Sequence, residues 1–151
     1  MASLFETVLS YFDAEGWTYR HLPGRQGIEA GVEGEHGRYV VVALVDGEEI
    51  FRILTFLDGR VPEARRREVT EFVTRANYGL LLGNFEFDVN DGELRYKSSI
   101  DLEDSALSQA QFRNLLFGSL AALDRYLPHL QRVMQGTADP AAAVADAEHG
   151  E

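Results

Sequence analysis

The sequence predicts an α+β fold, in which a twisted antiparallel sheet of about five strands carries three helices packed mainly on one face. Two patterns point to this class. Five segments of strand length either alternate apolar and polar residues or are apolar on both faces for much of their length, and turn residues separate them. Three other segments repeat apolar residues every three or four positions, as amphipathic helices do. Because 151 residues suffice for one core, we expect a single domain over residues 1–136 and a tail over residues 137–151.

The first helix is predicted to begin after Ser3. Ser3 and Glu6 form a capping-box pattern, in which each side chain reaches a free backbone amide of the first turn. Gly16 suits the left-handed position that ends a helix. The buried face consists of apolar residues at helical spacing, namely Phe5, Val8, Leu9 and Phe12.

Three consecutive strands are predicted after a short extended piece over residues 17–22. Residues 28–33 alternate apolar and polar side chains, which indicates a half-exposed strand. Residues 39–45 and 49–57 are apolar on both faces for most of their length, as strands covered on both sides are. The Asp-Gly pair between them is a strong hairpin signal, so we expect an antiparallel meander.

A second helix and a second hairpin follow. Pro62 suits the first position of a helix, where its missing amide hydrogen leaves no bond unmade. The buried stripe of this helix comprises Val69, Phe72, Val73 and Ala76. Strands are then expected over residues 80–89 and 93–102, joined by a turn with the sequence Asn-Asp-Gly.

The third helix is predicted to begin after Ser108, which forms a second capping-box pattern with Gln111. Pro128 is expected to kink or end this helix, with one more turn over residues 130–134. The long apolar face of the helix comprises Phe112, Leu115, Leu116, Leu120, Leu123 and Leu127, with Ser119 among them.

The tail carries four acidic residues and no Lys or Arg. Asp139 before Pro140 suits the cap of a short helix, although acidic residues at the other end have the wrong sign for a helix C-terminus. A helix this short is marginal alone in water. We therefore expect it to dock on the body or on a second subunit, near exposed arginines such as those at 65–67. The alternative is a solvated tail.

The composition is acidic, since 25 Asp and Glu against 14 Lys and Arg give a formal net charge of −11. Such a surface repels phosphate backbones and anionic lipids, so we expect no direct binding to nucleic acid and none to membranes. It suits a basic partner. The chain has no cysteine, no signal-peptide pattern and no apolar run of membrane-spanning length. These features predict a cytoplasmic protein.

The sequence shows no converging groups that would form a catalytic or metal site. Its histidines lie at positions 21, 36, 129 and 149, and none has a second ligand at metal-binding spacing on a shared helix. The acidic residues around 86–93 fail the calcium-loop pattern, since Phe87 and Val89 take the first and third ligand positions. No nucleophile elbow, phosphate loop or dinucleotide fingerprint occurs. We expect no catalytic residue, no metal and no cofactor, and hence a protein that is not an enzyme.

The apolar surplus of the predicted sheet indicates an interface. Three helices cover one face of a sheet and only part of the other, so strands apolar on both faces leave an exposed apolar patch. We name Tyr78, Leu81, Phe85 and Phe87 as candidate partner-binding residues, because they flank the least covered strand. The alternative for each is an ordinary contact in the core or in a dimer.

Two stretches within residues 61–102, TRANYGLLLGNFEFD and RYKSSID, resemble the YbjN family of bacterial proteins. The opening LFETVLSYFDAEGW and the later NLLFGSLAALDRYLP are similar to the same family, so the resemblance covers most of residues 3–135. Family members are described as sensory transduction regulators. Their fold is similar to that of type III secretion chaperones, which are small acidic α+β homodimers that bind other proteins. The resemblance implies this chaperone-like fold and carries over no site residue.

Two functions stay open at this point. The first is a non-catalytic, chaperone-like adaptor or regulator that acts as a homodimer and binds a client protein. The alternative is a regulatory domain that senses a small ligand in a pocket between the sheet and the helices.

Overall fold

The computed structural model describes residues 1–150, and Glu151, the last residue of the predicted tail, lies outside the described residues. Within residues 1–150, a short 3-10 helix (Glu63–Arg65) precedes the second of four α-helices, which are α1 (Leu4–Ala14), α2 (Arg66–Gly79), α3 (Gln109–Met134) and α4 (Pro140–Glu148). The strands are β1 (Arg20–His21), β2 (Gly27–Glu33), β3 (Arg38–Asp46), β4 (Ile50–Leu57), β5 (Asn84–Phe87) and β6 (Leu94–Asp101). The α+β class is confirmed. The structure has one strand and one helix more than predicted. The additional strand is β1, which is only two residues long, and the additional helix is α4, which the tail forms.

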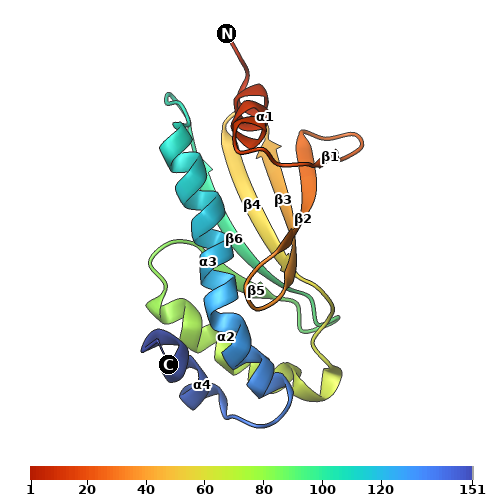
Figure 1. Ribbon diagram of the computed structural model, residues 1–151, viewed down its shortest axis with the longest axis vertical. Coiled ribbons are helices and arrows are strands. Elements are labelled where there is room, and N and C mark those ends of the chain that lie inside the picture. The colour runs from red at the N-terminus through yellow and green to blue at the C-terminus, as the bar shows by residue number, and fades with distance from the viewer. Residues whose placement is uncertain (151) are drawn as a thin grey trace.

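The strands form one antiparallel sheet in the order β1-β2-β3-β4-β6-β5. The predicted meander over β2, β3 and β4 is confirmed, with Asp46 opposite Ile50 at the hairpin turn. β6 lies beside β4 on the side away from β3, where Ile50 is opposite Asp101. β5 pairs with β6 and forms the edge of the sheet at this end. The chain therefore passes from β4 through α2 before the second hairpin joins the sheet (Figure 1).

One face of the sheet forms the core with the helices. Near the N-terminus, α1 and α3 pack Phe12 and Phe112 against β3 and β4. At the other end, α2, α3 and α4 surround Tyr126, whose ring meets Phe72 and Phe85 edge-on. Figure 1 shows α3 running along the sheet between these two regions, and its residues belong to both. This helix therefore joins the two halves of the core.

The helix starts follow the predicted capping. Ser3 with Glu6 begins α1 and Ser108 with Gln111 begins α3, each with both reciprocal hydrogen bonds. α3 then runs through Pro128, so this proline does not end the helix. Buried residues continue on both sides of the proline, and their burial outweighs the backbone hydrogen bond lost there, which costs about 3 kcal/mol.

Two predicted boundaries were wrong. Pro62 precedes the short 3-10 helix rather than opening α2. β5 begins only at Asn84, although a strand was predicted from residue 80. Residues 80–83 are taken up by the turn that returns the chain from α2 to the sheet, and Gly83 adopts a φ of 72° there. Over the described residues, none of the helices has both the length and the apolar composition that crossing a membrane requires.

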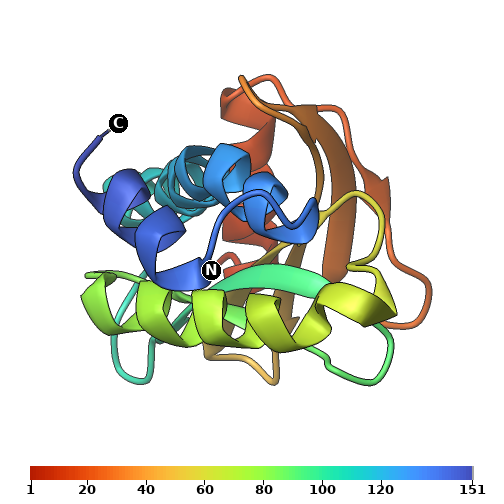
Figure 2. The same cartoon turned by 90° about the horizontal axis from the view of Figure 1, so that it is seen from below.

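The tail forms α4, and its docking on the body is confirmed. The side chain of Asp139 caps the helix, as predicted, by accepting hydrogen bonds from the first amides. α4 lies in the angle between α2 and α3 (Figure 2) and buries Ala143, Val144 and Ala147.

The arginines that hydrogen-bond to α4 come from α3, whereas Arg65 of the predicted group at 65–67 lies against Gly136, just before the tail. Arg125 donates hydrogen bonds to the carbonyl oxygens of Ala147 and Glu148, both at 2.9 Å. Arg132 pairs with Asp146 at 3.0 Å. A positive charge stabilises the C-terminus of a helix, and the acidic residues of α4 do not supply one. Arg125 supplies it from α3.

Candidate functional site

Three neighbouring apolar side chains are exposed where α2 ends. Tyr78, Leu81 and Leu82 are 96%, 93% and 65% exposed, respectively. Tyr78 lies in the last turn of α2, and the two leucines lie in the loop that leads to β5. Apolar side chains grouped at a surface are typical of protein-binding sites, because a partner removes them from water. We refer to these three residues as the α2–β5 surface.

The loop that carries the two leucines is held against β6. The hydroxyl of the buried Tyr96 donates a hydrogen bond to the carbonyl oxygen of Leu82. Burial and the neighbouring Tyr126 raise the pKa of Tyr96 to about 12, so this donor keeps its proton at neutral pH. A Cβ at Gly83 would lie only 2.6 Å from the Tyr96 ring, so the close approach requires glycine. The backbone of the loop is therefore fixed while its leucine side chains remain in water.

The edge of β5 beside this surface is partly closed by Asn77. The side-chain oxygen of Asn77 accepts a hydrogen bond from the amide of Phe85 at 2.7 Å, and its NH2 group donates to the carbonyl of Phe85 at 3.0 Å. The Asn77 side chain thus makes the same two hydrogen bonds to the backbone of Phe85 that a residue of a neighbouring antiparallel strand would make. Since open strand edges invite pairing with other chains, Asn77 favours contacts through side chains over pairing along β5.

The structure separates the four predicted contact residues. Tyr78 and Leu81 lie on the α2–β5 surface. Phe85 is only 2% exposed and packs edge-on against two buried tyrosines, so it is a core residue and the prediction of a partner contact is corrected. Phe87 is half-buried and packs against the same core. The physical reason is the alternation of a strand, which turns both phenylalanines of β5 toward the helices.

The sequence analysis did not name Leu82, because residues 80–89 are apolar for much of their length and were predicted to form one unbroken strand. The available signal was Gly83, since an isolated glycine inside a strand pattern often marks an interruption or a close backbone approach.

The sheet face opposite the helices, called here the outer face, has an apolar centre and a charged border. Val40 of β3 is exposed and lies opposite the partly buried Phe56 of β4. At the border, the carboxylate of Glu86 contacts Arg95 and Lys97 at 2.7 Å each. The prediction that β3 and β4 are apolar on both faces is therefore confirmed for their central residues.

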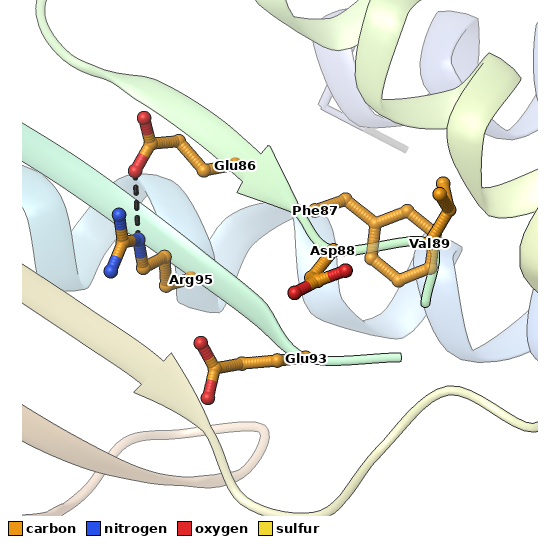
Figure 3. Close-up of a pocket in the computed structure, with 6 residues that line it drawn as sticks. All are labelled: Glu86, Phe87, Asp88, Val89, Glu93 and Arg95. Carbon is orange, nitrogen blue, oxygen red and sulfur yellow. Dashed lines mark hydrogen bonds and ion pairs between the residues drawn. The ribbon is translucent and has the colours of Figure 1, made fainter. Parts of the chain in front are cut away.

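A concavity of about 430 Å³ lies at the β5–β6 hairpin (Figure 3). Its lining includes Phe87, Val89 and several charged residues, and Figure 3 shows Glu86 pointing toward Arg95, with which it pairs. The concavity is on the surface of the hairpin. The interior between the sheet and the helices, where the ligand-sensing alternative expects a pocket, contains the packed side chains of the core.

These features define a small α+β domain in which a long helix covers a meander and an added hairpin. The sequence model of the YbjN family, described as "Putative bacterial sensory transduction regulator", matches residues 5–132. The chain therefore belongs to the YbjN family. The match spans α1 to most of α3 and leaves α4 outside it.

One solved structure with a similar fold is the crystal structure of YbjN from E. coli, called there "a putative transcription regulator". The two share 12% sequence identity and a TM-score of 0.64, over 80% of this chain and 85% of that chain. A comparison with curated proteins finds no match. The family is thus described as one of regulators, and the structural likeness supports the fold.

Proposed function

We propose that this protein is a non-catalytic regulator that binds another protein through the α2–β5 surface and that acts as a homodimer. The observation that carries the proposal is the exposure of Tyr78, Leu81 and Leu82 on a backbone fixed to β6. A surface that is ordered before binding loses little conformational freedom when a partner docks. The description of the family as regulators agrees with a binding role.

The surroundings of this surface indicate the chemistry of the partner. A groove of about 340 Å³ between α2 and α4 adjoins it and is lined by Tyr78, Ala141, Val144 and Glu148, among others. Glu148 lies against Gly79, and the whole chain carries a net charge of −11. A partner segment with apolar side chains and a basic flank fits this arrangement, with the basic flank beside Glu148.

A matched pair of variants tests the surface. Tyr78→Ser combined with Leu81→Ser removes two exposed apolar groups, whereas Val89→Ser removes a third exposed apolar group outside the surface, on a residue that is 53% exposed. The wild type and the Val89 variant should recover the same partner from the cell of origin. With that partner purified, the double variant should bind at least tenfold more weakly at an unchanged melting temperature. Equal affinities of all three proteins would contradict the proposal.

For the homodimer we propose contact through the outer face, because a second copy would remove Val40 and Phe56 from water. The border there carries both signs of charge, so two copies related by a twofold axis can place Glu86 near Arg95 of the partner. Light scattering at micromolar concentration should give about twice the 16.9 kDa of one chain. Val40→Asp should shift the mass toward one chain. A wild-type mass of one chain would refute the dimer and leave the α2–β5 test unaffected.

A further inference from the structure

The turn between β2 and β3 is attached to α3 by a single carboxylate. Asp124 accepts hydrogen bonds from the backbone amides of Glu35 and His36, both at 3.0 Å, and from the hydroxyl of Tyr39 at 2.5 Å. The approach is close because residue 34 is glycine, where a Cβ would lie 2.5 Å from Asp124 Oδ1. The turn is therefore held through its backbone, and the side chains of Glu35 and His36 are exposed beside Asp124.

This attachment brings three metal-ligating groups together. Glu35, His36 and Asp124 each offer a ligand atom, and these atoms lie within 4.8 Å of one another. A carboxylate has about four lone-pair positions. Asp124 uses two on Oδ1 and one on Oδ2 for its hydrogen bonds, so one position on Oδ2 can bind a cation while the turn stays attached.

We propose that Glu35, His36 and Asp124 bind a divalent transition metal ion of the Zn²⁺ type. An imidazole with two carboxylates suits such ions, whereas Ca²⁺ and Mg²⁺ sites consist of oxygen ligands. The two carboxylates neutralise the charge of the ion, and the hydrogen bonds to Asp124 orient its carboxylate. A cavity of about 590 Å³, lined by His36 and Asp124, adjoins the site and has room for water to complete the coordination. The site does not depend on the proposed protein-binding function.

The test titrates untagged, chelator-treated protein with Zn²⁺ by calorimetry. Glu35→Gln and His36→Gln each remove one ligand and keep the turn, because these residues contact Asp124 through their backbone amides. The controls are Glu33→Gln, an exposed carboxylate at the end of β2, and His21→Gln in β1. Wild type and controls should bind one Zn²⁺ per chain, and either ligand variant should bind at least tenfold more weakly. With Zn²⁺ at about 100 times Kd, the wild-type Tm should rise by about 5 to 10 °C.

Paramagnetic Ni²⁺ locates the ion independently. Amide NMR signals of residues 33–39 and 121–128 should broaden first, and those of β1 and of the α2–β5 surface should stay sharp. Absence of saturable Zn²⁺ binding would overturn the proposal. So would Zn²⁺ binding that both ligand variants leave unchanged, or Ni²⁺ broadening centred elsewhere, because each would assign the ion to another part of the surface.

Discussion

At the scale of single residues, Asn77 controls the edge of β5. Asn77→Ala removes both hydrogen bonds to Phe85 and leaves its partly buried backbone groups without them, so the free energy of unfolding should fall by about 1 to 3 kcal/mol. The uncovered edge should also promote concentration-dependent association. Urea unfolding and light scattering measure the two effects. Asn84→Ala is the control, because Asn84 makes only a 3.2 Å contact to the same carbonyl, and equal losses in both variants would contradict the role of Asn77.

The ion pairs of Glu86 make stability depend on pH. Burial acts to raise the pKa of Glu86, but hydrogen bonds from Lys97 and Arg95 outweigh it and lower the pKa. A carboxyl group of this kind stabilises the fold above its unfolded pKa of about 4.3, and the contribution is lost as pH falls through the lower folded pKa.

Glu86→Gln should therefore lower the free energy of unfolding by about 0.5 to 1 kcal/mol at pH 7, since the pair is partly exposed to water. The difference from wild type should persist down to about pH 5 and disappear in stronger acid. Urea unfolding across this range measures it, with the exposed Glu48→Gln as control. A difference that stays constant into stronger acid would assign the loss to packing instead of charge.

The residues of the α2–β5 surface were only partly predictable. Tyr78 and Leu81 could be named because apolar side chains next to an edge strand exceed what the helices can cover. Phe85 could not be excluded, since the turn at residues 80–83 had to be known before the face of β5 was settled. The contact of Asp124 with His36 joins positions 88 residues apart, and no local spacing signals it.

At the scale of elements, α4 should contribute to the stability of the whole domain. Deleting residues 137–151 removes the buried side chains of Ala143, Val144 and Ala147 together with the contacts to Arg125 and Arg132. Burial of this size corresponds to about 2 kcal/mol or more, so Tm should fall by about 4 to 8 °C.

Differential scanning calorimetry checks this loss. Val144→Ala should lose about 1 kcal/mol, and Ala142→Ser, on the exposed side of α4, should behave as the wild type. If the deleted chain melts as the full chain does, α4 makes no net contribution and its packing is incidental.

Elements were more predictable than their arrangement. Capping boxes, helical periodicity and the Asp-Gly turn act within a few residues, so α1, α3 and the β3–β4 hairpin followed from local patterns. The order of the strands in the sheet could not be predicted in this way, because β4 pairs with β6 and not with β5, the next strand in the sequence. The continuation of α3 through Pro128 depends on a core that forms only after folding.

At the scale of the whole molecule, charge argues against direct contact with nucleic acid. The net charge is −11, and prominent basic residues of the outer face, Arg95 and Lys97, are paired with Glu86. A phosphate backbone is bound by unpaired Lys and Arg. We therefore expect no mobility shift of DNA or RNA at low salt, where attraction is strongest. A salt-sensitive shift at micromolar protein would show that a local patch overrides the net charge.

β4 acquires its second neighbour late in synthesis, because β6 is made only after α2 and β5. Until then the nascent meander exposes the unpaired edge of β4. The side chains of Phe51 and Ile53 are also exposed, because α3, which covers them in the folded protein, has not yet been made. Chains paused at this stage should associate readily with one another, whereas release of the second hairpin closes that edge within the same chain. The pairing of distant segments should also make this closure the slow step of folding. The edge of β4 is therefore exposed from the time β4 leaves the ribosome until β6 does, and Phe51 and Ile53 remain exposed until α3 has also been made.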